Sequence, residues 1–305
     1  MSKSNITEPD DRIVTLNMNG LQGRMLILPP RGNKKRDILL VYGHHASIEY
    51  WTPLAEELTR YGNVTVPDLP GFGGMTSLYR IGEKPTVDKL ADYLAAFVKL
   101  RYKRRRPTII GIGFGFVVAT RMLGRYPELA KRIDVVVSVA GFTSHDDIKV
   151  SNQANTMYKL LVRLGKIRLP AWLLKTLVFH SPVLGWLYQL EPRLCKSLQT
   201  MCGSSFHADP GADIQLWRHN DVRTHMATTL EVLKLDNCSL RVSTPAWHVS
   251  LSASRDFDTH VLEQHMRVVF SNFHEVESGY DSNSAATDKQ TLLLPSKLRR
   301  ILNKA

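Results

Sequence analysis

The sequence predicts an α/β protein built on a mostly parallel, doubly wound sheet. Two observations lead to this prediction. Short apolar runs alternate with amphipathic segments along residues 37–140, and the alternation resumes at residues 245–277. In addition, a glycine-rich turn at 111–115 joins an apolar run to a helical segment, as strand-to-helix turns do in this fold class.

The first elements are predicted to be a β-hairpin and a buried strand. Arg12–Asn17 and Gly23–Leu28 flank Asn19-Gly20, a dipeptide favoured in tight hairpin turns. In Asp37–Tyr42 the apolar residues run without a polar break, which is typical of central strands in parallel sheets.

The rest of the first part alternates between helix and strand. Apolar residues at helical spacing predict the helices, and short apolar runs predict the strands. In chain order we expect a helix at Glu49–Tyr61, a strand at Asn63–Pro67, a helix at Thr86–Tyr102, the strand and helix of 107–126, and a strand at Ile133–Ala140.

From Ser144 to Leu240 the alternation stops, and the sequence predicts an inserted helical lid. Helical patterns fall at Met157–Leu164, Pro170–Phe179 and Pro182–Leu190. Apolar residues of this stretch either line an acyl-chain pocket or form the core of the lid itself: Trp172, Leu173, Leu174, Leu177, Trp186, Leu187 and Tyr188.

Alternation resumes after the predicted lid. We expect a strand at Pro245–Ser252, a helix at Thr259–Phe270, a last strand at Phe273–Glu277, and a terminal helix at Thr291–Asn303 that is broken near Pro295. The expected organisation is therefore a core in two parts, 1–143 and 241–305, with the insertion at 144–240 between them.

The chain is basic, with a formal net charge of +12. Such a balance either solubilises the surface or favours acidic partners. The densest run of charge is Arg101–Arg106, which is either a solvated helix C-terminus or a nucleic-acid surface. It is accompanied by no RRM, zinc-finger or helix-turn-helix pattern, so we expect no specific nucleic-acid partner, while peripheral contact with an anionic membrane stays open.

The cysteines and the apolar runs bear on the compartment. Cys195, Cys202 and Cys238 lack metal-site spacing and are predicted to be free thiols. The first residues contain no apolar leader, and no uncharged apolar run has the length of a membrane span. We therefore expect a cytoplasmic protein without a bound metal.

Four segments together resemble the α/β-hydrolase superfamily. Leu39–Ser47 is similar to the strand and H-G oxyanion loop of that family, with Tyr42 in place of the usual histidine. Val66–Gly74 is similar to the D-x-x-G-x-G loop, and 111–115 has the layout of the nucleophile elbow G-x-S-x-G. Tyr126–Ile133, which leads into an apolar strand, is the fourth segment. The resemblance covers most of the chain outside the predicted lid and implies the α/β-hydrolase fold.

The resemblance also implies a degenerate catalytic triad. Gly113 stands at the nucleophile position, Asp256 at the acid position with Asp258 as the alternative, and Tyr280 at the histidine position. Glycine supplies no nucleophile for acyl transfer, which needs an activated oxygen or sulfur. Outside the resemblance, Asp256 is also explained as a helix-capping turn residue and Tyr280 as a packing aromatic.

A ligand site survives the loss of the triad. The backbone N–H groups of Phe114 and His44 are expected to hold a carboxylate or an ester carbonyl, next to Gly43 in the oxyanion loop. His44 and His45 either contact a ligand or activate water, or they hydrogen-bond the backbone. Because neighbouring residues at a strand end point to opposite sides, we expect at most one of them to face the pocket.

The expected function is that of a pseudoenzyme that binds a small acyl or carboxylate ligand. Two alternatives remain: an active α/β-hydrolase with a non-serine mechanism, and a basic surface-binding protein for anionic lipid or nucleic acid. G-x-G-x-G at 111–115 differs from the dinucleotide pattern G-x-G-x-x-G, so no cofactor is expected. The oligomeric state is left open.

Overall fold

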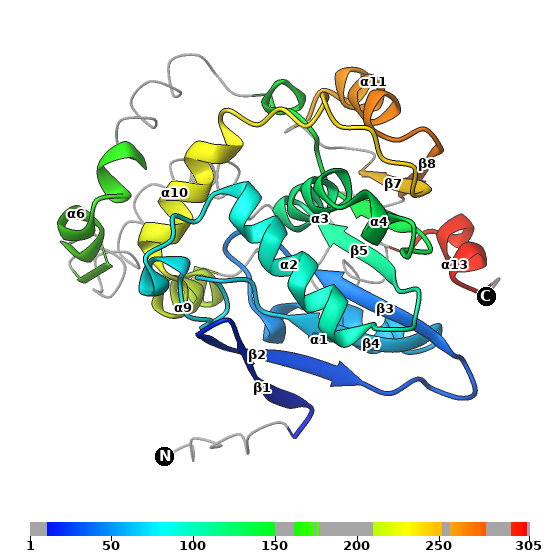
Figure 1. The fold of residues 1–305 in the computed structure, drawn as a ribbon, viewed down its shortest axis with the longest axis horizontal. Coiled ribbons are helices and arrows are strands. Elements are labelled where there is room, and N and C mark those ends of the chain that lie inside the picture. The colour runs from blue at the N-terminus through cyan, green and yellow to red at the C-terminus, as the bar shows by residue number, and fades with distance from the viewer. Residues whose placement is uncertain are drawn as a thin grey trace.

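In the computed structural model the described residues are 11–149, 162–173, 175–176, 210–251, 257–278 and 294–303, and they form a central sheet flanked by helices (Figure 1). In this part of the chain the sheet has eight strands, in the spatial order β1-β2-β4-β3-β5-β6-β7-β8. The pairs β1–β2 and β2–β4 are antiparallel, and the other pairs are parallel. The strands are β1 (Ile13–Met18), β2 (Leu21–Leu28), β3 (Arg36–Val41), β4 (Gly62–Pro67), β5 (Thr108–Ile112), β6 (Val136–Val139), β7 (Ala246–Leu251) and β8 (Phe273–Ser278). The predicted mostly parallel α/β sheet is confirmed.

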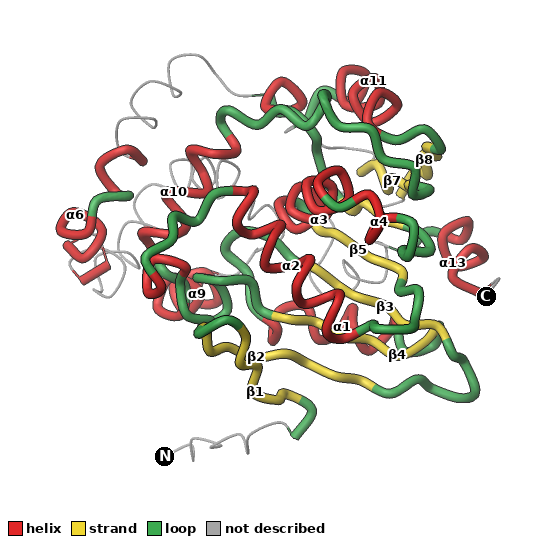
Figure 2. The backbone as a smooth tube through the Cα atoms, in the orientation of Figure 1, coloured by secondary structure: helices red, strands yellow, loops and turns green. Residues whose placement is uncertain are grey.

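Helices cover both faces of the sheet, as Figure 2 shows in red against the yellow strands. Helices α2, α3, α4 and α11 share one apolar cluster with the sheet, and α1 and α13 share another on the opposite face. Within the described residues no helix combines the length and apolarity needed to cross a bilayer. The bounds are α1 (Ile48–Leu58), α2 (Val87–Arg101), α3 (Phe114–Arg125), α4 (Pro127–Ala130), α11 (Thr259–Val269) and α13 (Ser296–Asn303), with short 3-10 turns η1 (Leu78–Ile81) and η2 (His145–Asp147).

Strand β3 shows why its sequence has no polar break. Leu39 and Val41 pack into the cluster with α2 and α3, whereas Ile38 and Leu40 pack into the cluster with α1. Successive side chains of a strand point to opposite faces, and here both faces are covered. The two buried faces account for the uninterrupted apolar run.

The hairpin at the N-terminus forms as predicted. Asn19 and Gly20 have φ values of 53° and 77°, the positive values that a two-residue hairpin turn of this type requires. The turn sets the register in which Met18 faces Leu21.

Two predicted boundaries were too wide. The helix expected at Glu49–Tyr61 ends at Leu58, because the chain closes a tight turn before β4, with the Tyr61 N–H donating to the Leu58 carbonyl at 2.9 Å. The strand expected from Ile133 begins at Val136, because the Ile133 N–H is used in the turn after α4. The terminal helix was predicted to break near Pro295, and its described part begins at Ser296, directly after that residue.

Between β6 and β7 the described residues with regular structure are helical. Residues 162–165 form one turn, followed by α6 (Arg168–Leu173), α9 (Pro210–His219) and α10 (Val222–Val232). Helix α6 begins two residues before the predicted Pro170 start. The predicted helix Pro182–Leu190 and the first part of Met157–Leu164 lie outside the described residues.

Two of the apolar residues that the sequence assigned to the predicted lid lie in α6 and are exposed. Trp172 and Leu173 are 59% and 39% exposed, so neither belongs to a packed core. In this six-residue helix the buried residue is Ala171. Leu174, Leu177, Trp186, Leu187 and Tyr188 lie outside the described residues.

Candidate functional site

The turn between β5 and α3 lies at the carboxyl edge of the sheet. Gly113 joins the two elements with φ 51° and ψ −119°, and its N–H donates to the Val139 carbonyl at 3.0 Å. L-residues rarely adopt a positive φ of this kind, so glycine is the residue without strain here. A Cβ placed on Gly113 meets no atom of the described residues within 4 Å. The backbone conformation, and not a lack of room, is therefore what disfavours a side chain at this position.

Gly111 and Gly115, which flank Gly113, are explained by close packing and not by backbone conformation. A Cβ on Gly111 would lie 2.5 Å from the Cα of Phe116, and one on Gly115 would lie 2.1 Å from the Val41 carbonyl oxygen. Both contacts are with backbone atoms that have no freedom to move away. These two glycines let α3 approach β5 and β3 closely, which places the start of α3 at the sheet edge.

The loop after β3 packs against this helix start. A Cβ on Gly43 would lie 2.7 Å from the Phe114 nitrogen. The next residue, His44, stacks its ring on Phe114 with the centroids 4.0 Å apart, and its Nε2 is 2.7 Å from the hydroxyl oxygen of Thr228. Three predicted site residues, Gly43, His44 and Phe114, thus meet beside Gly113.

His45 also turns inward, which corrects the expectation that at most one of the two histidines does so. Both side chains are buried, and both contact His225 of α10, with centroid separations of 5.1 Å for His44 and 5.9 Å for His45. The alternation argument fails because β3 ends at Val41 and His45 has a positive φ of 50°. The backbone reverses between the two residues instead of continuing as a strand.

The resulting cluster of rings joins the sheet edge to the helices that follow β6. The ring centroid of Trp217 in α9 lies 4.2 Å from that of His45 and 4.9 Å from that of His225. The ring centroids of Phe72 and His44 are 5.5 Å apart. Among the described residues, neither ring nitrogen of His225 has a hydrogen-bond partner. No three His, Cys, Asp or Glu side chains of the described residues are arranged to hold a metal ion.

Burial keeps two of these histidines neutral. It lowers the pKa of His44 to about 3, with a smaller contribution from His45. It also lowers the pKa of His225 well below its usual value, and His44 and His45 add to the effect. A buried imidazole disfavours its charged form because the cation loses its hydration. Both rings therefore act as neutral, mostly aromatic surfaces at pH 7.

A polar network holds the loops beneath the cluster. The Tyr42 hydroxyl donates to a carboxylate oxygen of Asp68, and Arg24 Nε donates to the other at 3.2 Å. Arg24 Nη1 also donates to Glu49 Oε1 at 2.6 Å, and Arg24 Nη2 donates to the Gly73 carbonyl oxygen at 2.6 Å. Burial raises the pKa of Asp68 to about 7, and the hydrogen bond from Tyr42 and the charge of Arg24 oppose that rise. The network connects the two loops whose motifs were separate in the sequence.

Of the three residues predicted for the acid and histidine positions, the structure describes one. Asp256 and Tyr280 lie outside the described residues. The alternative acid, Asp258, is described: it is the N-cap of α11 and accepts a hydrogen bond from the Val261 N–H at 3.3 Å. Asp258 therefore has the capping role that the sequence assigned to Asp256 as a second explanation.

Three residues of this site were not predicted from the sequence: Trp217 of α9, His225 of α10, and Asp68. Nothing in a single sequence says which part of an insertion returns to the sheet edge. Asp68 belongs to the loop motif 66–74 but had no role assigned to it, and its position directly after the apolar strand β4 was the available signal.

This architecture is the α/β-hydrolase fold that the resemblance seen in the sequence implied, with a mostly parallel sheet, a strand-to-helix turn at Gly113 and a loop after β3 that packs against the start of α3. No protein-family model and no curated protein sequence matches the chain. The fold assignment rests on solved structures.

Those structures are enzymes of the same fold with low sequence identity. A putative epoxide hydrolase from Pseudomonas aeruginosa has a TM-score of 0.67 at 17% identity, over 99% of this chain and 100% of that one. A serine-to-glycine mutant of the N-acyl homoserine lactonase AidH, complexed with N-hexanoyl homoserine lactone, has a TM-score of 0.63 at 15% identity, over 95% and 97%. The enol-lactonase from Burkholderia xenovorans LB400 has a TM-score of 0.60 at 15% identity, over 95% and 96%.

Proposed function

We propose that this protein is a pseudoenzyme of the α/β-hydrolase fold that binds a small acyl or carboxylate ligand beside Gly113. The observation that carries the proposal is the turn itself. At the position from which this fold presents a nucleophile, the chain has a glycine with φ 51° and no atom of the described residues near its missing side chain. A hydrogen atom cannot attack an acyl carbon, whereas the space above it can accept a ligand.

The ligand's polar end is proposed to bind the backbone. The Phe114 N–H is at the first position of α3, where an N–H has no acceptor within the helix, and it lies at the positive end of the helix dipole. The His44 N–H is the proposed second donor from the facing loop, which Gly43 holds against α3. Two such donors suit a carboxylate or an ester carbonyl oxygen.

The apolar end is proposed to lie among the rings. Phe72 and Phe114 contact His44, and Trp217 contacts His225, so these rings line the two neutral histidines. Such a wall suits an acyl chain better than a charged group. We propose that residues 144–240 are a lid over this site, since Trp217 and His225 belong to that stretch and contact the loop after β3.

The titration of the histidines supports binding over hydrolysis. A general base works best with a pKa near the working pH. His44, with a pKa of about 3, and His225, whose pKa is also strongly lowered, are poor proton acceptors for an attacking water. Asp256 and Tyr280 remain the proposed acid and histidine positions, and a tyrosine there supplies no imidazole.

The complex of the AidH mutant suggests the first probe. That protein, with a serine replaced by glycine, is complexed with N-hexanoyl homoserine lactone. We therefore propose an N-acyl lactone or a medium-chain carboxylate as the ligand class of this chain.

The test is calorimetric titration with N-hexanoyl homoserine lactone and with hexanoate. We expect a Kd on the order of micromolar to millimolar. Gly113→Val should abolish binding because its side chain fills the site. Gly82→Val is the matched control, since exposed Gly82 also has a positive φ, 80°, and open space. Equal loss in both variants, or no binding by the wild type, would contradict the site.

A second measurement tests the absence of catalysis. We expect no labelling by a fluorophosphonate and no hydrolysis of short acyl esters, either by the wild type or by Gly113→Ser. Robust labelling or hydrolysis by the wild type would overturn the pseudoenzyme and establish the non-serine hydrolase in its place.

A further inference from the structure

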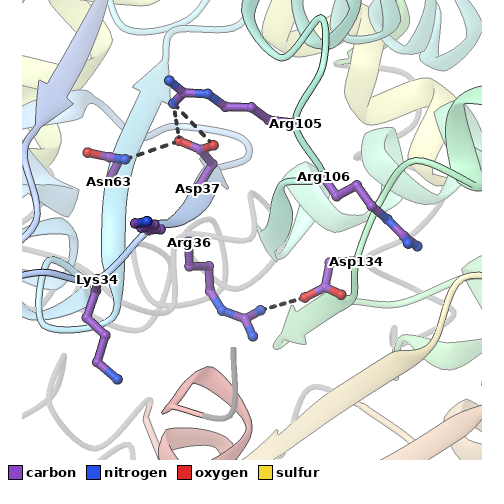
Figure 3. A pocket seen from close by; sticks show the side chains of 8 residues that line it. Lys34, Arg36, Asp37, Asn63, Arg105, Arg106 and Asp134 are labelled. Atoms are coloured by element: carbon purple, nitrogen blue, oxygen red, sulfur yellow. Dashed lines mark hydrogen bonds and ion pairs between the residues drawn. The ribbon is translucent and has the colours of Figure 1, made fainter.

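The edge of the sheet opposite Gly113 has a strongly basic face. A depression of about 580 Å³ lies where β3, β4, β5 and β6 begin (Figure 3). Arg106 and Gly113 lie at opposite ends of β5, so this depression is distinct from the proposed acyl site. Its lining residues are Lys34, Lys35, Arg36, Asp37, Asn63, Arg105, Arg106 and Asp134.

The two carboxylates in the depression are already engaged. Figure 3 shows Arg105 directed at Asp37 and Arg36 directed at Asp134. The nitrogen–oxygen distances are 3.0 Å and 2.7 Å. The cationic Lys34, Lys35 and Arg106 have no ion pair with any described residue. An excess of positive charge is therefore left facing solvent.

A second depression continues the first. It shares Asp37 and Arg105 with it and adds Arg101, Lys103 and Arg104 at the end of α2. We define the basic face as the eight cationic side chains and two carboxylates that line the two depressions, a formal net charge of +6. The whole chain has +12, so half of its surplus charge is concentrated on this face. The basic face consists of Lys34, Lys35, Arg36, Asp37, Arg101, Lys103, Arg104, Arg105, Arg106 and Asp134.

The surroundings favour a lipid surface over a nucleic acid. Leu100, which lines the second depression, is 59% exposed, whereas Tyr102, the aromatic residue that lines it, is buried. Single-stranded nucleic acid binds by stacking bases on exposed aromatic rings, and the lining of this face offers none among the described residues. Cations around an exposed apolar side chain suit phosphate-bearing headgroups at a membrane surface.

We propose that the basic face is a binding surface for anionic membranes, with phosphate-bearing lipid headgroups seated among Lys34, Lys35 and Arg106. The contact is peripheral and electrostatic. It is independent of the acyl site, since it uses side chains at the other edge of the sheet.

The test is sedimentation of the full chain with vesicles. Phosphatidylcholine vesicles containing phosphatidylserine should bind the wild type, and pure phosphatidylcholine vesicles should not. Replacing Lys34, Lys35 and Arg106 together by Gln should lower the partition coefficient about tenfold to a hundredfold. These three side chains form no ion pair with a described residue, so the variant keeps Arg36–Asp134 and Arg105–Asp37 intact.

The matched control removes the same charge elsewhere. Lys84, Lys166 and Arg218 are exposed cations outside the basic face, and their triple replacement by Gln should leave binding within about twofold. Equal loss in both triple variants would show a response to net charge alone and would overturn the proposal.

Two further outcomes would also overturn it. The first is tighter binding of a DNA duplex or an RNA strand than of anionic vesicles at the same salt concentration, which would identify a nucleic-acid surface. The second is loss of vesicle binding in Leu169→Ser with Trp172→Ser while the basic-face variant still binds, which would move the contact to the exposed side of α6.

Discussion

The Tyr42 hydroxyl donates a hydrogen bond to Asp68, and this contact joins the end of β3 to the loop after β4. This contact also explains why residue 73 is a glycine. A Cβ on Gly73 would lie 2.4 Å from the Tyr42 hydroxyl oxygen. The Gly73 N–H in turn donates to the Asn220 side chain at 2.8 Å, which connects the same loop to the helices after β6.

Removal of that hydroxyl should be costly. Tyr42→Phe leaves a buried carboxyl group with one partner fewer, and we expect the free energy of unfolding to fall by about 1–3 kcal/mol. Tyr93→Phe is the control, because the hydroxyl of buried Tyr93 has no partner among the described residues. Urea denaturation should show little change or a gain for Tyr93→Phe, and an equal loss in both variants would contradict the role of Asp68.

The glycines at 113 and 115 should respond differently to a methyl group. Gly113→Ala places a side chain at φ 51° in open space, so we expect a loss of about 1–2 kcal/mol from backbone strain alone. Gly115→Ala drives a Cβ to 2.1 Å from the Val41 carbonyl oxygen and should cost at least about 3 kcal/mol. The midpoints of urea denaturation measure both losses of stability. A larger loss in Gly113→Ala than in Gly115→Ala would contradict this description of the turn.

Stability should fall as the pH drops below about 6.5. Burial lowers the pKa of His44 to about 3, of His248 to about 4, and of His225 well below normal. The unfolded chain takes up these protons near pH 6.5 and the folded chain does not, so acid favours unfolding by up to about 1.4 kcal/mol per pH unit for each histidine. Asp68 has the opposite effect: its pKa is raised to about 7, so the folded chain takes up this proton before the unfolded chain does, and acid favours folding. This single carboxyl group offsets the effect of only one of the three histidines.

A single replacement isolates one of these protons. In His225→Phe the loss of unfolding free energy between about pH 7 and about pH 5 should be smaller than in the wild type by about 2 kcal/mol. His260→Phe, at an exposed position of α11, is the control and should keep the wild-type slope. An unchanged slope in His225→Phe would mean that this ring takes up a proton in the folded state.

Asp147 and Asp146 provide a test within one turn. Buried Asp147 accepts hydrogen bonds from the N–H groups of Thr143 and Ser144, at 2.7 and 2.9 Å, and lies 2.5 Å from His265 Nδ1. Asp147→Asn should lower the free energy of unfolding by about 2–4 kcal/mol. Exposed Asp146 contacts His145, and Asp146→Asn should change stability by no more than about 0.5 kcal/mol. Comparable losses in a urea titration would show that charge, and not burial, sets the effect.

The sheet and the glycine turn at its edge could be predicted from the sequence. The apolar run 38–41 is typical of a strand that is covered on both faces of a parallel sheet, and Asn19-Gly20 specifies its turn through local backbone conformation. Gly43, Gly111, Gly113 and Gly115 were also evident, because backbone conformation and close backbone approach leave few alternatives to glycine. These features depend on neighbours in the chain or on a simple periodicity.

The residues that surround this turn could not be predicted, because they come from distant parts of the chain. His225 and Trp217 reach His45 from more than 170 positions further along the chain, and no local pattern records which helix of an insertion returns to the sheet. The direction of His45 depends on a positive φ in a loop, which a strand-based rule cannot anticipate. The basic face likewise forms because parallel strands start at one edge, so that Lys34 and Arg106, distant in the chain, line the same depression.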